Sequence, residues 1–279
     1  MSTRTQISIL CENTAVRPGV LGEFGFSAWV ESGSRGVLFD TGAGDTLAHN
    51  ADRMGIALAK VEAVVLSHGH DDHTAGLGHV LEVAPAVRLF AHPAALEQKY
   101  TVAGDGPLMR DGVPPHILTL LRERETIVIP TKEPTEVLPG ITATGEIPRT
   151  NDFETDASAR YRDPGGQKRD SLPDDQALVV DTPRGSVVVV GCAHAGVINT
   201  LDHVRENLGV KRIRAVVGGM HLIPAGEDRL ARTIEGLRRL EVDLVVPMHC
   251  TGLLAGALFR RELGDRCLFS GAGGVLEFS

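Results

Sequence analysis

The chain has 279 residues, of which 42% are hydrophobic and 23% are charged. These proportions are ordinary for a globular protein and exclude a disordered chain, a coiled coil or a fibrous protein. A formal net charge of −8 and an aromatic content of 4% argue against a nucleic-acid partner, because that binding needs basic surfaces and stacking rings. No apolar run approaches the ~18 residues that span a bilayer, and the first residues lack a signal-peptide pattern. We therefore expect a cytoplasmic protein with no membrane partner.

The first ninety residues predict short strands separated by turns and two helices. Apolar or alternating runs predict strands at 5–11, 26–31, 36–39, 63–67 and 87–90. Helices are expected at 45–54, with Asp45 as the candidate N-cap, and at 74–82.

The middle of the chain, at about 100–176, is rich in Pro, Gly and charged residues. Such composition is typical of loops between short strands. A structureless loop of this length is uncommon inside a domain unless it serves a function. We therefore expect a single domain over 1–279 with an irregular, substrate-facing insertion at about 100–176.

The second half returns to alternating strands and helices. Strands are expected at 177–182, 186–192, 213–219 and 243–248, and helices at 197–208, 227–240 and 253–263. Continuous runs such as VVVV at 187–190 indicate strands that are covered on both faces. Strands packed against helices in both halves predict an α/β layered sandwich.

The segment His68-Gly69-His70-Asp71-Asp72-His73 follows the predicted strand 63–67. In extended chain, His68 and His70 point to the same side, whereas Asp72 and His73 come from the turn into a helix and approach from another direction. Imidazole and carboxylate groups are ligands for zinc, iron or manganese. One short loop could therefore supply ligands to two neighbouring metal ions.

Further candidate ligands stand directly after other predicted strands: Cys192 and His194, His221, and His249 with Cys250. Strand ends are where α/β proteins place their sites, so these side chains are expected to support the same site. Cys192 as a small buried apolar residue and His221 as a packing residue remain alternatives. His221 could also contact a phosphate or a metal ligand.

The pattern His-x-His-x-Asp-His after a strand, preceded by FDTG at 39–42, resembles the metallo-β-lactamase superfamily. The resemblance narrows to the subgroup typified by 7,8-dihydropterin-6-methyl-4-(β-D-ribofuranosyl)aminobenzene 5'-phosphate synthase. It rests on motifs that occur in the same order along the chain: ENTAV, FGFSAWVE, LFDTG, SHGHDDHTAGL, AHP, TGEIPR, DDQALVV, GCAHAG, GGMHL and HCTG.

The resemblance implies a four-layer αββα sandwich with two divalent metal ions between the sheets, Zn²⁺ first and Mn²⁺ or Fe²⁺ as alternatives. It assigns His68 and His70 to the first ion and Asp72 and His73 to the second, with His249 and His194 completing the set. Asp72 would also be catalytic, by orienting a water molecule or taking its proton. Asp40 and Asp175 could hydrogen-bond ligand histidines, although a turn role is equally open for Asp175.

The chain departs from the superfamily pattern at two positions. Cys192 stands where a bridging Asp is usual, and Glu146 stands near the usual third His of the first site. Either His194 and Glu146 replace the missing ligands, or one metal position is weak. A thiolate also ligates zinc, so Cys192 is a further candidate.

Three functions follow from these residues. The first is an enzyme of the synthase type, acting on a phosphorylated or diphosphate-activated small molecule. The second is a metallo-hydrolase that attacks a phosphoester or lactone with a metal-bound hydroxide. The third is a non-catalytic metal- or ligand-binding protein. The expected partner is a small, anionic substrate, and the sequence leaves the oligomeric state open.

Overall fold

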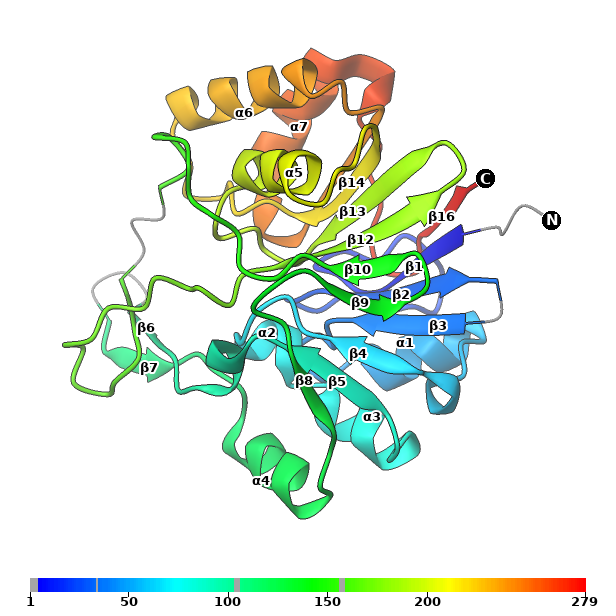
Figure 1. Ribbon diagram of the computed structural model, residues 1–279, viewed down its shortest axis with the longest axis vertical. Coiled ribbons are helices and arrows are strands. Elements are labelled where there is room, and N and C mark those ends of the chain that lie inside the picture. The colour runs from blue at the N-terminus through cyan, green and yellow to red at the C-terminus, as the bar shows by residue number, and fades with distance from the viewer. Residues whose placement is uncertain (1–4, 34, 103–105, 156–158) are drawn as a thin grey trace.

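Two large sheets pack face to face in the computed structural model, which describes residues 5–33, 35–102, 106–155 and 159–279 (Figure 1). The first sheet has seven strands in the order β16 (Val275–Phe278), β1 (Thr5–Cys11), β2 (Ser27–Ser32), β3 (Arg35–Phe39), β4 (Ala63–Val65), β5 (Arg88–Ala91) and β8 (Val128–Pro130). The second has six strands in the order β15 (Leu244–Met248), β14 (Ile213–Gly219), β13 (Gly185–Val190), β12 (Ala177–Thr182), β10 (Ile141–Ala143) and β9 (Thr135–Leu138).

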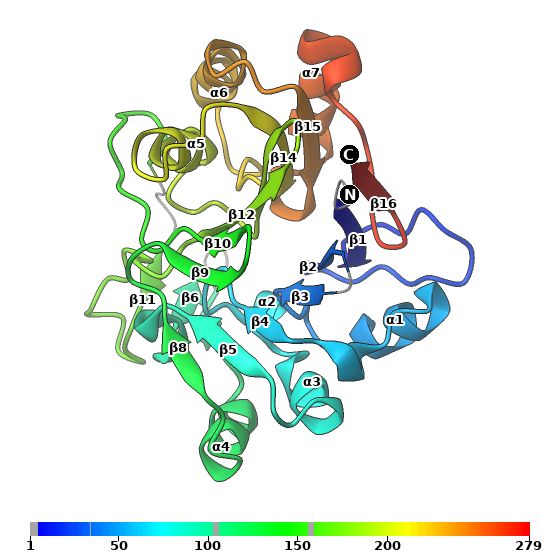
Figure 2. The ribbon, with the colours of Figure 1, turned by 45° about the vertical axis from the view of Figure 1, so that its right-hand side comes forward.

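Helices cover the outer face of each sheet, as Figures 1 and 2 show. The first sheet is covered by α1 (Leu47–Met54), α3 (Leu77–Val83) and α4 (Pro115–Glu123). The second is covered by α5 (Val197–Glu206), α6 (Glu227–Arg239) and α7 (Leu253–Leu263). Short helical turns fill the connections: η1 (Leu58–Lys60), α2 (Asp71–Thr74), η2 (Pro93–Leu96), η3 (His249–Thr251) and η4 (Gly264–Arg266). None of the helices in the described residues is long and apolar enough to cross a membrane.

Three separate apolar clusters hold the four layers together. The β13 run VVVV shows how, because its side chains alternate between the two faces of the strand. Val187 and Val189 join the cluster between the two sheets. Val188 and Val190 join the cluster beneath α5, α6 and α7. The prediction of strands covered on both faces and of an αββα sandwich is therefore confirmed.

The segment 100–176 is more regular than its composition indicates. β8, β9 and β10 are members of the two main sheets, and α4 is a helix that the sequence reading missed. A separate three-stranded sheet remains, formed by β11 (Arg160–Tyr161), β6 (Tyr100–Val102) and β7 (Leu108–Arg110). The expected insertion is thus reduced to this small sheet and its loops, with residues 103–105 and 156–158 outside the described part.

Two expected helices differ from the observed ones for local reasons. Asp45 does not cap α1, because the N-cap position is Thr46. The backbone N–H groups of Asp45 and Thr46 donate to Glu23 Oε2 at 3.0 Å. The helix expected at 74–82 is observed as α3, which begins only at Leu77. The separate short helix α2 ends at Thr74, and Gly76 lies between the two. A Cβ at Gly76 would lie 2.1 Å from the Thr41 carbonyl oxygen, so the chain passes there only as glycine.

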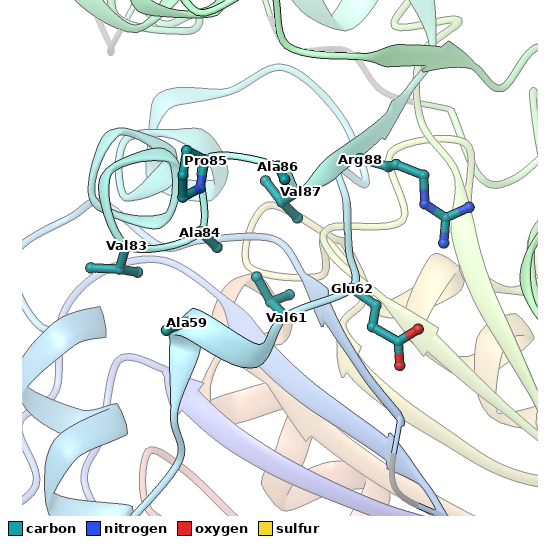
Figure 3. Close-up of a pocket in the computed structure, with 9 residues that line it drawn as sticks. All are labelled: Ala59, Val61, Glu62, Val83, Ala84, Pro85, Ala86, Val87 and Arg88. Carbon is teal, nitrogen blue, oxygen red and sulfur yellow. The ribbon is translucent and has the colours of Figure 1, made fainter.

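A surface hollow of about 320 Å³ lies where α3 runs into β5 (Figure 3). Its lining is mostly aliphatic, and its acid, Glu62, is paired with Arg35 at 3.1 Å. Arg88 in this lining pairs in register with Ala63 at the beginning of β4, whereas His68 follows the end of that strand. The hollow is therefore remote from the histidine cluster.

Candidate metal centre

The loop that follows β4 brings three buried imidazoles together. His68 Nε2 lies 2.8 Å from His70 Nδ1, and the ring centroids of His68 and His73 are 4.3 Å apart. The loop fits only because residue 69 is glycine, since a Cβ there would lie 2.1 Å from the Ala95 carbonyl oxygen. The Gly69 N–H donates to buried Asp174.

Three neighbouring parallel strands deliver the other histidines to the same place. β13, β14 and β15 end side by side, and they are followed by His194, His221 and His249 respectively. The His194 ring centroid lies 4.8 Å from that of His68 and 4.3 Å from that of His221. The His249 ring centroid lies 5.1 Å from that of His73. The strand ends that the sequence singled out thus meet at one edge of the sandwich.

Cys192 lies at the centre of the cluster. Its thiol belongs to three groups of possible ligands, and within each group the ligand atoms lie within 4.8 Å of one another. These groups are Cys192 with His68 and His194, with His73 and His249, and with His221 and Cys250. Imidazole, carboxylate and thiolate together form the donor set that zinc prefers, so the residues present fit divalent metal ions.

Asp72 lies beside the second of these groups. Its Oδ2 is 3.2 Å from His249 Nε2 and 3.7 Å from His73 Nε2. Burial would raise the pKa of Asp72, but the charges of His73 and His249 outweigh burial and hold that pKa well below its usual range. The carboxylate is therefore ionised at neutral pH and available to a cation.

The backbone around the cluster is held in an uncommon conformation. Asp40, Ala193, His221 and His249 have φ angles of 58°, 50°, 48° and 47°, in the left-handed region that non-glycine residues rarely adopt. His221 and His249 are candidate ligands, Ala193 precedes His194, and Asp40 contacts His73. Strain of this kind persists only where the surrounding structure fixes it, and it concentrates at functional sites.

Asp40 connects the first sheet to the cluster. Its carboxylate accepts hydrogen bonds from the Ser67 backbone N–H and hydroxyl, both at 2.6 Å, and lies 2.7 Å from His73 Nδ1. With Nδ1 held in this way, His73 Nε2 faces the Cys192 thiol at 3.2 Å. Burial lowers the pKa of His73, but Asp72 and Asp40 outweigh it and raise the pKa to about 9. The hydrogen bond expected of Asp40 is present.

Two further candidates differ in their placement. Asp175 is buried and accepts a hydrogen bond from the Ala195 N–H at 2.8 Å, so it holds the backbone of the loop that carries His194. Burial raises the pKa of Asp175 to about 6. Glu146 is exposed, and no hydrogen bond or ion pair joins its side chain to the cluster in the described residues, so the structure does not bring it there as a ligand. His70 and Asp72 also belong to none of the three donor groups, but they contact His68 and His249 respectively.

Several residues around the cluster carried no role in the sequence reading. Glu12 accepts a hydrogen bond from the His249 N–H at 2.7 Å, and Asn13 Oδ1 lies 2.9 Å from His249 Nδ1. These contacts join positions more than 230 residues apart. For Glu12 and Asn13 the sequence carried one signal, because ENTAV at 12–16 is among the motifs that resemble the subgroup. That motif does not indicate which residue they contact.

Arg160 in β11 of the small sheet and Asp111, directly after β7, form an ion pair beside His70. Arg160 Nη1 lies 3.1 Å from His70 Nε2 and 3.2 Å from Asp111 Oδ2. Burial raises the pKa of Asp111 to about 7, against the opposing charge of Arg160. The side chains of Arg160, Asp111 and Asp72 are 14%, 20% and 18% exposed, so solvent reaches the cluster from this side.

Comparison with known proteins supports the superfamily resemblance. The profile of the metallo-beta-lactamase superfamily matches residues 20–249. The chain is 29% identical over 269 residues to 7,8-dihydropterin-6-methyl-4-(beta-D-ribofuranosyl)-aminobenzene-5'-phosphate synthase of Methanocaldococcus jannaschii, covering 92% of this chain and 90% of that protein. It is also 29% identical over 250 residues to the uncharacterized protein MJ0448 of the same organism, covering 89% and 91%.

Among solved structures, Tm1679, described as a metal-dependent hydrolase of the beta-lactamase superfamily, superposes with a TM-score of 0.84. The two chains are 32% identical, and the match covers 99% of each.

Proposed function

The chain belongs to the metallo-β-lactamase superfamily, and we propose that it is a metal-dependent enzyme acting on a phosphorylated or diphosphate-activated small molecule. The observation that carries this proposal is the convergence of possible ligands at one edge of the sandwich. These are Asp72, Cys192 and the five histidines His68, His70, His73, His194 and His249. The similarity to the synthase supports the substrate class.

Two divalent ions are proposed, each held by a different part of the donor set. His68, His70 and His194 would hold the first ion, and Asp72, His73 and His249 the second, with Cys192 between them. Bound divalent ions stabilise negative charge on a phosphoryl or carbonyl oxygen and acidify water. Whether the attacking group is water or a second substrate, Asp72 orients it from the side that solvent reaches.

The charged pair on the small sheet is suited to hold an anionic substrate. Arg160 presents a planar guanidinium at the exposed side of the cluster, a group that matches phosphate oxygens with paired hydrogen bonds. Asp111 holds Arg160 in place at 3.2 Å. A substrate phosphate would compete with Asp111 for the guanidinium, so the small sheet contributes to substrate choice.

Hydrolysis is the second candidate, and it is favoured by the 32% identity to Tm1679, which is described as a hydrolase. The same residues serve hydrolysis and condensation, because both develop charge on an oxygen atom that the cluster faces. The two reactions differ only in whether water or a second substrate attacks.

The first test is elemental analysis of protein purified without added metal, for the wild type, His68→Ala and His194→Ala. His116→Ala is the matched control, because His116 is exposed on α4. We expect about two ions per chain in the wild type, as in other binuclear sites, with losses in both cluster variants and none in the control. Unchanged metal content in His194→Ala would remove His194 from the ligand set.

The second test measures turnover of pterin diphosphates with a (β-D-ribofuranosyl)aminobenzene 5'-phosphate acceptor, and of phosphoesters and lactones without one. Product formation only with the acceptor supports condensation, and release of phosphate or ring-opened acid without it supports hydrolysis. A metal-loaded protein that turns over none of these compounds would favour the binding-protein hypothesis.

Metal affinity is expected to rise with pH between 7 and 9. The pKa of His73 in the metal-free protein is about 9, so its imidazole carries a proton at neutral pH that a cation must displace. His68 needs no such step, because burial lowers its pKa and keeps it neutral. Displacement of the His73 proton alone increases the affinity by about tenfold per pH unit below this pKa. The Cys192 thiol, whose pKa burial raises, also gives up a proton on binding and makes the profile steeper. Chelator competition at pH 7, 8 and 9, corrected for the chelator's own protonation, measures it, and a flat profile would contradict it.

A further inference from the structure

The four cysteines fall into two classes. Cys11 and Cys267 belong to the apolar clusters beneath the two helical layers, as small buried cysteines commonly do. Cys192 and Cys250 are as deeply buried, with 4% and 5% exposure, but they belong to none of the apolar clusters of the described residues. Packing alone therefore does not account for their position.

Cys192 and Cys250 face each other at the ends of two strands. Their Sγ atoms are 3.2 Å apart, although they lie 58 positions apart in the chain. Cys250 immediately follows His249 in η3, and Cys192 follows β13. The two thiols therefore stand at the same edge of the sandwich as the histidine cluster.

His221 lies between the two cysteines, because it follows β14, the strand between β13 and β15. Its backbone N–H donates to Cys250 Sγ at 3.3 Å, and its ring lies within ligand distance of both thiols. His221 has a left-handed φ of 48°, which is uncommon for a residue other than glycine. Gly219 makes room for the sulfur, because a Cβ there would lie 2.7 Å from Cys250 Sγ.

We propose that Cys192, Cys250 and His221 form a thiolate-rich position for a thiophilic divalent cation such as Zn²⁺. All three possible ligand atoms lie within 4.8 Å of one another, and two thiolates with one imidazole are a donor set that zinc favours. This position goes beyond the proposed function, which requires neither Cys250 nor His221. Cys192 would connect it to the two histidine-rich positions.

Cobalt substitution tests the proposal, because Co²⁺ bound to thiolate shows a sulfur-to-cobalt charge-transfer band whose intensity grows with the number of thiolates. The full, reduced, metal-free chain is titrated with Co²⁺ as the wild type, Cys250→Ser and Cys267→Ser. We expect Cys250→Ser to weaken the band at saturation, because one of the two thiolates is gone, and the remaining intensity comes from Cys192. Cys267→Ser should match the wild type. An unchanged band and unchanged affinity in Cys250→Ser would overturn the proposal.

Cadmium NMR of the wild type covers the case in which Cys250→Ser does not fold. A resonance in the range of two-thiolate ligation supports the proposal, and resonances with no more than one thiolate overturn it. Neither readout depends on turnover. A protein inactive toward every substrate tested can still show two-thiolate ligation, and an active enzyme can lack it, so this proposal and the proposed function fail separately.

Discussion

Cys192→Ala is expected to release the metal ions from the histidine cluster, whereas Cys192→Asp is expected to retain them. Cys192 is the one residue shared by all three donor groups, and its Sγ lies 3.2 Å from His73 Nε2. Alanine removes this shared donor and leaves the remaining imidazoles without a bridge. Aspartate replaces the thiolate with a carboxylate, which is also a zinc ligand.

The loss in Cys192→Ala should exceed about 100-fold in metal affinity, beyond the 10–100-fold cost of losing a hydrogen-bond partner of a ligand. Elemental analysis and competition with a chelator measure it, with Cys267→Ala as the matched control in an apolar cluster. If Cys192→Ala kept its metal, Cys192 would be a packing residue, and the histidines with Asp72 would form the sites.

Asp40→Asn is expected to weaken both the metal centre and the fold. The carboxylate accepts three hydrogen bonds, two from Ser67 and one from His73, and it is fully buried. An amide of the same shape presents N–H groups where two donors already converge, which leaves buried donors without an acceptor. Asparagine tolerates the left-handed φ of 58° at this position, so the backbone is not the cause of any loss.

We expect Asp40→Asn to lower the free energy of unfolding of the metal-free protein by about 1–3 kcal/mol. Metal affinity should fall by about 10–100-fold, because His73 loses the group that orients its ring. Chemical denaturation and chelator competition measure the two effects. Asp181→Asn is the control, since Asp181 is exposed on β12 and its carboxylate accepts a hydrogen bond from the Ser186 hydroxyl at 2.8 Å, away from the cluster. Equal effects of the two substitutions would show that Asp40 does not position His73.

The local sequence determined strands β1 to β5 and β12 to β15, most helices and the layered class of this fold. The VVVV run required cover on both faces because alternate side chains point to opposite sides, and the structure places them in two different apolar clusters. The spacing of His68, His70, Asp72 and His73 sufficed to indicate a metal site, because these residues form one local loop. Such features depend on neighbours in the chain, which a single sequence displays.

The tertiary structure alone decided which distant residues meet. The segment 100–176 looked irregular because β8, β9 and β10 are short and are stabilised by pairing with strands far along the chain. The contacts of His249 with Glu12 and Asn13, of Arg160 with His70 and of Cys192 with Cys250 leave no local periodicity. The Cys192–Cys250 contact follows from the register in which the parallel strands β13 and β15 end. The other contacts join separate parts of the fold, so packing of the whole sandwich sets them. The sequence therefore identified the kind of chemistry, and only the folded chain placed Cys192 at its centre and Glu146 outside it.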